Sequence, residues 1–194
     1  MHELVELTSK ISRGISPKYV QNDGVCVLNQ KCIRNGTVNF ELGRRHDEVS
    51  SKGVDAKKVR LFDVLVNSTG VGTLGRVALL KRLDEEIVTV DSHVTFVRGD
   101  DKKINKVYLG VLLVEKQNEI ESFALGSTGQ VELSRSQLEG IKIIVPPKVL
   151  QEEFEKICLP LFEKMNLNEV ENQELREIRD MLLPMLMVGQ ITVQ

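Results

Sequence analysis

The sequence has few of the residues on which small enzymes, membrane proteins and disulfide-rich domains depend. Its 194 residues include no Trp, three His, three Cys and five Pro, and aromatic residues make up 4%. No apolar run approaches the roughly 20 residues that a membrane-spanning helix needs. The start, MHELVELTSK, lacks the basic and apolar blocks of a secretory signal. We therefore expect a globular cytoplasmic protein without a membrane segment.

The residues that bind metals or perform catalysis occur in no recognisable pattern. The cysteine count is odd and the spacing from Cys26 to Cys32 is not that of a zinc site, so we expect reduced thiols. No two histidines have a metal-ligand spacing. There is no glycine-rich loop followed by Lys and Ser or Thr, and no Gly-x-Ser-x-Gly elbow. We therefore expect a protein that is not an enzyme and needs no cofactor or metal.

Residues 1–147 are rich in short runs of Val and Ile separated by Gly, Asn, Asp and Ser, which is typical of strands and turns. Five runs predict strands, namely 25–33, 59–66, 76–80, 87–97 and 141–145. The alternation of apolar and polar residues in 87–97 predicts a single half-buried strand. A helical period interrupts the strands from Lys106 to about Ala124. We expect an α+β domain over 1–147 with a curled or barrel-like sheet.

Residues 148–194 have a different composition, rich in Glu, Leu, Lys and Gln, and predict a long helix. Alternating steps of four and three residues select mostly apolar positions, the pattern of a coiled-coil seam. Polar residues interrupt the middle of the seam, and Pro160 predicts a kink or a break. Such a helix needs a partner helix, in this chain or another, unless it packs on its own domain. The residues expected to pair the helices are Leu150, Phe154, Ile157, Leu161, Leu175, Ile178 and Leu182.

The charge is distributed unevenly along the chain. Residues 1–147 hold 21 Lys and Arg against 19 Asp and Glu, whereas residues 148–194 hold 5 against 9. The first part is mildly basic and the second acidic, which permits a nucleic-acid contact in the first part without requiring one.

One loop pattern occurs twice, as STGVGTLGR at 68–76 and STGQVELSR at 127–135. Ser and Thr can contact phosphates or base edges, Gly lets the backbone turn sharply, and Arg can bind a phosphate or a guanine. The alternative is that Ser-Thr-Gly is a common turn triplet and that each Arg pairs with a nearby carboxylate. The repetition favours two similar contact edges on one domain.

Six segments, in chain order, are ISRGISPKY, VLNQKCIRNG, VNSTGVGTLGRVA, TVDSHVTFVR, GSTGQVELSRSQLEGIKIIVPP and RDMLLPMLMVGQITV. Together they resemble the specificity subunit of type I restriction-modification systems. The resemblance implies a target recognition domain, which reads one half of a split DNA site, followed by a helical spacer. It also implies that two spacers pair antiparallel and dock the methyltransferase subunits. A full member has two recognition domains and two spacers, whereas this chain has one of each.

The resemblance implies double-stranded DNA, a methyltransferase subunit and, through the complex, a restriction subunit as partners. The single spacer suggests a homodimer, or else half of a longer protein. The DNA-contacting residues that we expect from the polar loops are Arg13, Ser16, Lys18, Asn29, Gln30, Lys31, Arg34, Ser68, Thr69, Thr73, Arg76, Ser127, Thr128, Gln130, Ser134 and Arg135. Arg44, Arg45, Lys57 and Lys58 are expected to contribute salt-sensitive attraction to the DNA backbone.

Two other functions are compatible with the residues alone. One is a stand-alone nuclease that uses the neighbourhood of Asp91 and His93. The other is a protein-interaction adaptor whose helix dimerises and which binds no DNA. The resemblance favours DNA recognition without catalysis over both.

Overall fold

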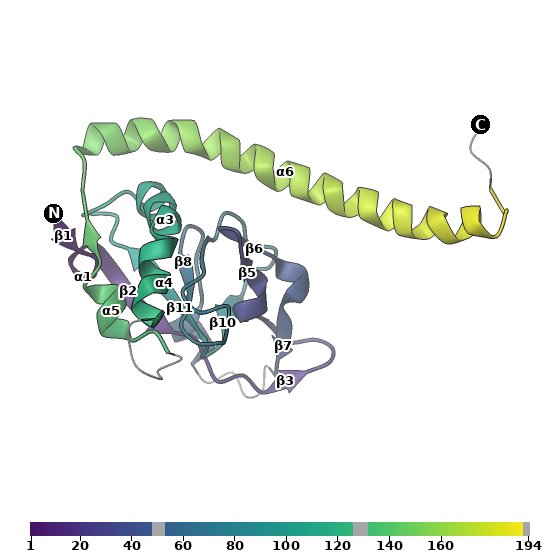
Figure 1. The fold of residues 1–194 in the computed structure, drawn as a ribbon, viewed down its shortest axis with the longest axis horizontal. Helices are drawn as coiled ribbons and strands as arrows, with labels where there is room; N and C mark the ends of the chain where they lie inside the picture. Colours follow the sequence, from purple (N-terminus) through teal and green to yellow (C-terminus); the bar gives the residue numbers. More distant parts are fainter. Residues whose placement is uncertain (48–52, 126–131, 192–194) are drawn as a thin grey trace. The chain divides into compact units, whose positions relative to one another are not determined.

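The computed structural model describes residues 1–47, 53–125 and 132–191. Its internal contacts divide the chain into two compact units, Met1–Glu155 and Lys156–Gln194. The first unit contains the strands and the short helices, and the second contains most of one long helix (Figure 1). The predicted α+β class and the long carboxyl-terminal helix are confirmed.

An antiparallel sheet of four strands, in the order β2-β11-β8-β9, forms the centre of the first unit. Its strands are β2 (Thr8–Arg13), β11 (Val94–Gly99), β8 (Val64–Asn67) and β9 (Val77–Leu79). Every residue of β8 and β9 is buried, which explains their near-continuous runs of apolar residues.

A second sheet of four strands has the order β10-β4-β7-β3. It consists of β10 (Val88–Val90), β4 (Val25–Leu28), β7 (Arg44–His46) and β3 (Tyr19–Val20), with β10 parallel to β4. Two small pairs, β1 with β12 and β5 with β6, complete the described strands. Their bounds are β1 His2–Glu3, β12 Lys142–Ile143, β5 Ile33–Arg34 and β6 Thr37–Val38.

The described strands do not close into a barrel. Each four-stranded sheet ends in two different edge strands, β2 and β9 in one and β10 and β3 in the other. The sheet that the sequence predicts to be curled or barrel-like is therefore not a closed barrel among the described residues. Both sheets instead pack on one core, to which β4, β10, β8 and β11 contribute Leu28, Val90, Leu65 and Phe96.

Residues 87–97 form two strands, β10 and β11, and not the single half-buried strand that the sequence predicts. The turn between them is fixed by Asp91, whose Oδ1 accepts the backbone N–H of His93 at 2.9 Å. Thr89 and Thr95, two of the polar residues in this alternation, are buried and bond to Lys57 and Ser68. Because both faces of these strands are covered, a period of two does not indicate exposure here.

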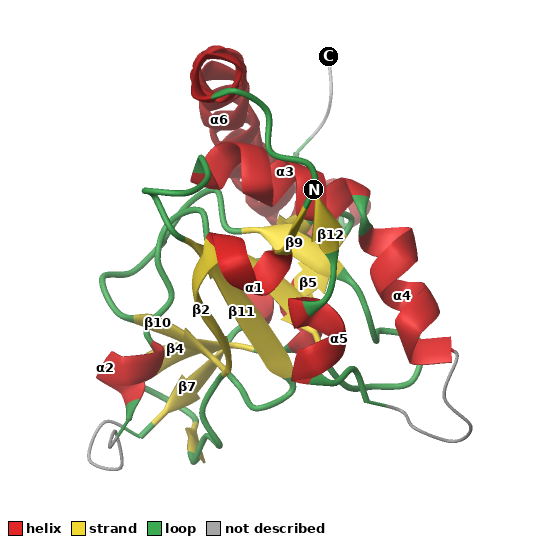
Figure 2. Cartoon of the chain, turned by 90° about the vertical axis from the view of Figure 1, so that its left-hand side faces the viewer, coloured by secondary structure: helices red, strands yellow, loops and turns green. Residues whose placement is uncertain are grey.

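Short helices surround the sheets (Figure 2). The α-helices are α1 (Leu4–Leu7), α2 (Val54–Lys57), α3 (Lys106–Glu115), α4 (Gln117–Leu125) and α5 (Arg135–Glu139), and the 3-10 helices are η1 (Gln30–Cys32) and η2 (Phe40–Leu42). The predicted helix from Lys106 to about Ala124 is thus two helices, divided at Lys116. Gly110 lets α3 approach β9, since a Cβ there would lie 2.4 Å from Cδ1 of Leu79.

The long helix α6 spans Lys148–Met187. It continues through Pro160 and Pro184, so the break that Pro160 predicts does not occur. Within the described ranges, none of the helices has the length and apolar character needed to cross a membrane.

Candidate nucleic-acid interface

Several loops meet at one end of the central sheet. Arg13, at the end of β2, pairs with Thr95 near the start of β11, and Asn67, at the end of β8, pairs with Val94. The loop between β8 and β9, the turn before β11 and the chain leaving β2 are therefore neighbours. We call this region the loop edge and define it by the described residues Arg13, Gln30, Thr69, Thr73, His93 and Glu132.

The two Ser-Thr-Gly segments are in direct contact at the loop edge. The carbonyl oxygen of Ser68 accepts the backbone N–H of Leu133 at 2.9 Å, and Thr69 forms an antiparallel bridge with Glu132. Arg13 adds a side-chain clamp, because its Nη2 lies 2.5 Å from Glu132 Oε1 and 3.2 Å from Leu133 O. The repeated pattern therefore supplies two segments that are joined to each other.

The 68–76 loop is held in a tight conformation by its glycines and threonines. Gly70 has φ of 107°, and a Cβ there would lie 2.0 Å from Gln30 Oε1. The Thr73 hydroxyl donates to the same oxygen at 3.1 Å. Arg76 turns back on its own loop, with Nη2 donating to Gly72 O at 2.8 Å. Gln30 and Thr73 thus lie together, whereas the guanidinium of Arg76 supports the loop from within.

His93 is exposed at the loop edge but firmly placed. Its backbone N–H donates to Asp91, its carbonyl oxygen accepts the N–H of Ser68 at 2.9 Å, and its Nδ1 lies 2.7 Å from Thr69 Oγ1. His93 and Glu132 are not among the residues that the sequence predicts to contact DNA. An Asp-Ser-His turn is visible in the sequence, but only the pairing of β8 with β11 brings it to Thr69.

Asp91 has a structural role in this arrangement. Its side chain is buried, and desolvation raises the pKa of its carboxyl group. The carboxylate accepts from the backbone N–H of His93 and from the Tyr19 hydroxyl at 3.4 Å, and not from the His93 ring. Across the described ranges, no group of three or more His, Cys, Asp or Glu side chains could hold a metal ion.

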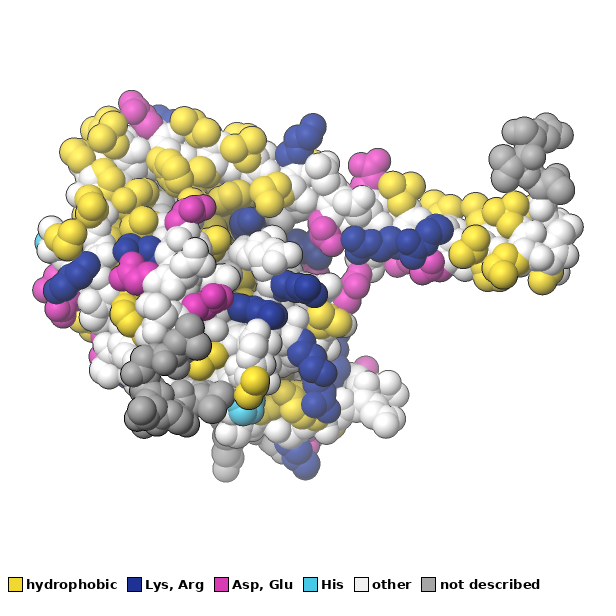
Figure 3. Space-filling view, in the orientation of Figure 1, with side chains coloured by type: hydrophobic (Ala, Val, Ile, Leu, Met, Phe, Trp, Pro, Cys, Tyr) yellow, Lys and Arg dark blue, Asp and Glu magenta, His cyan; other side chains and the backbone are white. Residues whose placement is uncertain are grey.

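A second set of predicted residues is strongly basic and lies in or next to β3, η1, β5 and β7. Lys18, Lys31, Arg34 and Arg44 are exposed, and we call these four residues the basic surface. Arg44 stacks on Tyr19, with Cζ 3.5 Å from the ring centroid, and Lys18 pairs with Asp47 at 3.1 Å. Figure 3 shows Lys and Arg side chains gathered over the part of the first unit where Figure 1 draws β5, β6 and β7. Ser16 is exposed as well.

Two of the predicted contact residues are buried, and the structure contradicts the prediction that they face DNA. Asn29 begins η1, where its Oδ1 accepts the N–H of Lys31 and its amide donates to Leu42 O. Ser68 is 0% exposed and bonds to Thr95 at 2.5 Å. Both side chains are used to hold backbone or neighbouring strands, the usual role of short polar residues at turns.

The remaining loop predictions fall into two groups. Ser134 begins α5 and accepts the N–H of Gln137, while Arg135 is exposed and pairs with Glu139 at 2.6 Å. Ser127, Thr128 and Gln130 lie outside the described residues. Of the charges expected to attract DNA, Arg45 pairs with Glu85 and Lys57 bonds to Gly14 O, whereas Lys58 is half-buried.

The predicted seam of α6 is mostly exposed. Leu150, Ile157, Leu161, Leu175 and Ile178 are all exposed, Ile157 by 66%. Phe154 differs, because its ring packs edge-on against Tyr108 with the centroids 5.8 Å apart. The Phe154 ring therefore packs within the first unit and is not available to pair two helices. Leu182 is partly exposed.

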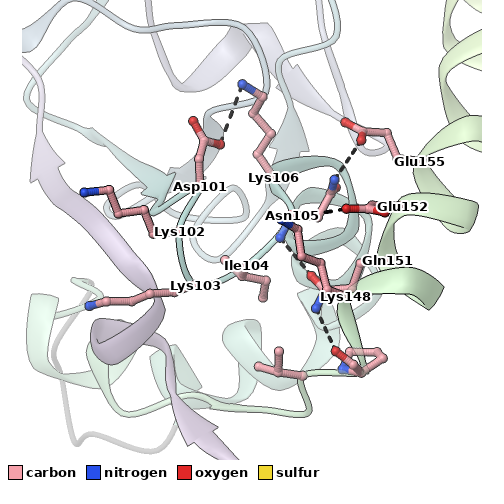
Figure 4. Close-up of a pocket in the computed structure, with 12 residues that line it drawn as sticks. Asp101, Lys102, Lys103, Ile104, Asn105, Lys106, Lys148, Gln151, Glu152 and Glu155 are labelled. Atoms are coloured by element: carbon pink, nitrogen blue, oxygen red, sulfur yellow. Dashed lines mark hydrogen bonds and ion pairs between the residues drawn. The ribbon is translucent and has the colours of Figure 1, made fainter.

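The first two turns of α6 are bonded to the loop before α3 (Figure 4). Gln151 is buried, accepts the N–H of Asn105 at 2.8 Å and donates to Pro146 O at 2.7 Å. Asn105 also donates to Glu155 at 2.9 Å. These residues line a cavity of about 410 Å³ together with Lys102 and other charged side chains.

Residues 31–177 match the family model described as the type I restriction modification DNA specificity domain. The chain belongs to this family. One relative, the type I restriction enzyme HindI specificity subunit of Haemophilus influenzae, is 30% identical over 121 residues, which are 62% of this chain and 26% of that protein. The MjaIX specificity subunit of Methanocaldococcus jannaschii is 39% identical over 62 residues, or 32% of this chain and 14% of that protein.

Solved structures of specificity subunits share the fold of this family member. The type I restriction-modification S subunit of M. genitalium superposes with a TM-score of 0.63 at 18% identity, covering 94% of this chain and 44% of that one. The HsdS subunit of Thermoanaerobacter tengcongensis gives 0.57 at 15% identity, with 95% and 43% covered. The chain thus spans less than half the length of these relatives.

Proposed function

We propose that the chain recognises one half of a split DNA site and directs the methyltransferase and restriction subunits of a type I complex to it, without catalysis of its own. The observation that carries this proposal is the family match over residues 31–177. The matched range includes all of the basic surface except Lys18 and all of the loop edge except Arg13 and Gln30. The comparisons support neither the nuclease nor the adaptor. Because such a complex acts on DNA, we infer that this chain is located in the cytoplasm of a bacterial or archaeal cell.

The proposal gives the basic surface and the loop edge different roles in DNA binding. The exposed cations of the basic surface attract DNA phosphates and contribute affinity that depends on salt. The loop edge presents Gln30, Thr69, Thr73 and their neighbours, whose amide and hydroxyl groups suit base edges. Phosphate contacts orient a protein on the duplex, and base contacts select the sequence.

We also propose that two copies of the chain pair through the exposed seam of α6. A stripe of exposed Leu and Ile residues on a long helix is favoured only if another surface covers it. Pairing two copies would provide two recognition domains related by a two-fold axis. The chain spans less than half of the longer subunits, so pairing would restore the number of recognition domains that those subunits are expected to carry.

Binding of a mixed-sequence duplex at several salt concentrations tests whether the basic surface contributes electrostatic affinity for DNA. The logarithm of the association constant should fall linearly with the logarithm of salt concentration. Changing Lys31, Arg34 and Arg44 each to Ala should reduce the slope by about 1 per contacted phosphate. Lys102→Ala is the matched control, because Lys102 is exposed after β11, at the end of the sheet opposite the loop edge. Binding that is absent or independent of salt would favour the adaptor.

A further inference from the structure

We propose that His93 contacts an acceptor atom on a base edge and that Thr69 is the positioning residue that orients its ring. This inference rests on the proposed function and deepens it. His93 joins the set of candidate contact residues because of where the strands place it, and not because of its sequence neighbours. Its ring, its N–H and its carbonyl oxygen each have a partner on a different buried or paired residue.

The geometry leaves one ring atom available. Nδ1 is taken by the Thr69 hydroxyl at 2.7 Å, while Nε2 has no bonding partner among residues 1–47, 53–125 and 132–191. We assign the hydroxyl as the donor, which places the proton of the neutral ring on Nε2. The Nε2–H group then suits an acceptor such as N7 or O6 of guanine in the major groove.

The placement of His93 is costly to disturb. Its backbone is fixed by the buried Asp91 carboxylate and by Ser68, which is itself bonded to Leu133. A side chain held by such contacts loses little conformational freedom when it binds. This preorganisation distinguishes His93 from the long exposed side chains of the basic surface.

The charge of the surroundings favours a base over a phosphate. The Glu132 carboxylate pairs with the Arg13 guanidinium, and Glu132 is bridged to Thr69, the residue that holds the ring. Because the two charges of this pair offset each other, Arg13 offers a phosphate little net attraction beside His93. The cations that suit phosphates are instead Lys31 and Arg34 of the basic surface, which are exposed and form no ion pair with any residue that the structure describes.

Four variants of the full chain separate a base contact from a merely structural role. His93→Gln keeps a nitrogen donor near the position of Nε2, whereas His93→Asn removes it. Thr69→Ser keeps the hydroxyl that orients the ring, whereas Thr69→Val removes it. The His93 side chain is exposed, so thermal unfolding of its variants should match that of the wild type and serves as the folding control.

The readout is base preference in duplexes selected from a randomised library by each variant with its methyltransferase subunit. His93→Asn and Thr69→Val should lose discrimination at the same single position, on the order of 2- to 10-fold, the effect of one hydrogen bond. His93→Gln and Thr69→Ser should retain it. Unchanged preference in all four variants, or a uniform loss of affinity without a change of preference, would overturn the assignment. If the wild type itself selects no sequence, the proposed function fails and this inference fails with it.

Discussion

The backbone N–H of Leu133 donates to the carbonyl oxygen of Ser68 at 2.9 Å, and this bond joins the two Ser-Thr-Gly segments of the chain. The neighbouring residues extend the contact, because Thr69 bridges Glu132 and Arg13 clamps Glu132 from β2. Ser68 and Thr69 of the first segment therefore lie beside Glu132 and Leu133 of the second, although the two segments are far apart in the sequence. The proposed division between a base-reading edge and a basic surface follows from this arrangement.

Removing the charge of Glu132 should strengthen DNA binding. In Glu132→Gln the carboxylate that neutralises Arg13 is replaced by a neutral amide, so Arg13 becomes an uncompensated cation at the loop edge. We expect affinity for a duplex to rise between about 2- and 5-fold at low salt, with a smaller gain at high salt. Glu86→Gln makes the same charge change at an exposed residue before β10 and is the control. Equal gains in both variants would mean that only the net charge matters.

The burial of Asp91 predicts a stability that depends on pH. Desolvation raises the pKa of this carboxyl group above its value in the unfolded chain, so folding favours the protonated form. Its contribution is complete below the unfolded pKa of about 4 and is lost as the pH rises through the folded pKa. Asp91→Asn keeps an oxygen for the N–H of His93 but does not titrate.

Urea unfolding at a series of pH values checks this prediction. The free energy of unfolding of the wild type should decrease relative to that of Asp91→Asn as the pH rises from about 4, the ordinary range of aspartate. A difference that stays constant or grows with pH would show that hydrogen bonds to the charged carboxylate outweigh its desolvation.

Gln151 should be important for the stability of the first unit. It is buried, and its amide bonds to Asn105 and Pro146 on two different segments. Gln151→Ala leaves the N–H of Asn105 and the carbonyl oxygen of Pro146 without these partners, which should cost about 1–3 kcal/mol of unfolding free energy. Glu155→Gln is the matched control, since it keeps an acceptor for Asn105. Similar losses in both variants would contradict the assignment of this role to buried hydrogen bonds.

The seam of α6 predicts how the chain associates. Ile157→Glu and Ile178→Glu place a charge among the exposed apolar residues of the helix and should convert a dimer to a monomer in sedimentation experiments. Gln173→Glu adds the same charge on the helix away from the seam and should leave the dimer intact. A wild-type chain that is monomeric at all concentrations would contradict homodimerisation.

The sequence predicts the class of the fold better than its topology. The change of composition after Pro147 correctly predicts α6, because a long amphipathic pattern is a local property of the chain. The topology of the sheets is not predicted, because strand pairing brings β4 beside β10, with Cys26 paired to Val88, and local patterns do not encode this choice. Pro160 fails to break α6 even though proline removes a backbone donor.

The sequence also predicts only some of the residues of the candidate site. The sequence predicts Arg13, Gln30, Thr69 and Thr73 as polar residues in loops, and the structure brings them to the loop edge. Asn29 and Ser68 meet the same criterion but are buried, because Asn29 bonds to the backbone of Lys31 and Leu42 and Ser68 bonds to the side chain of Thr95. No local signal in the sequence places Glu132 or His93 at the loop edge, because the bridge to Thr69 and the pairing of β8 with β11 bring them there.

Selection of duplexes from a randomised library, with the full chain and its methyltransferase subunit, tests DNA recognition most directly. We predict enrichment of two inverted half-sites separated by a spacer of fixed length, since two copies related by a two-fold axis would read the same half-site twice. A single unsplit motif would retain recognition but contradict pairing of two copies. Enrichment of no sequence under these conditions would contradict the recognition of DNA by this chain.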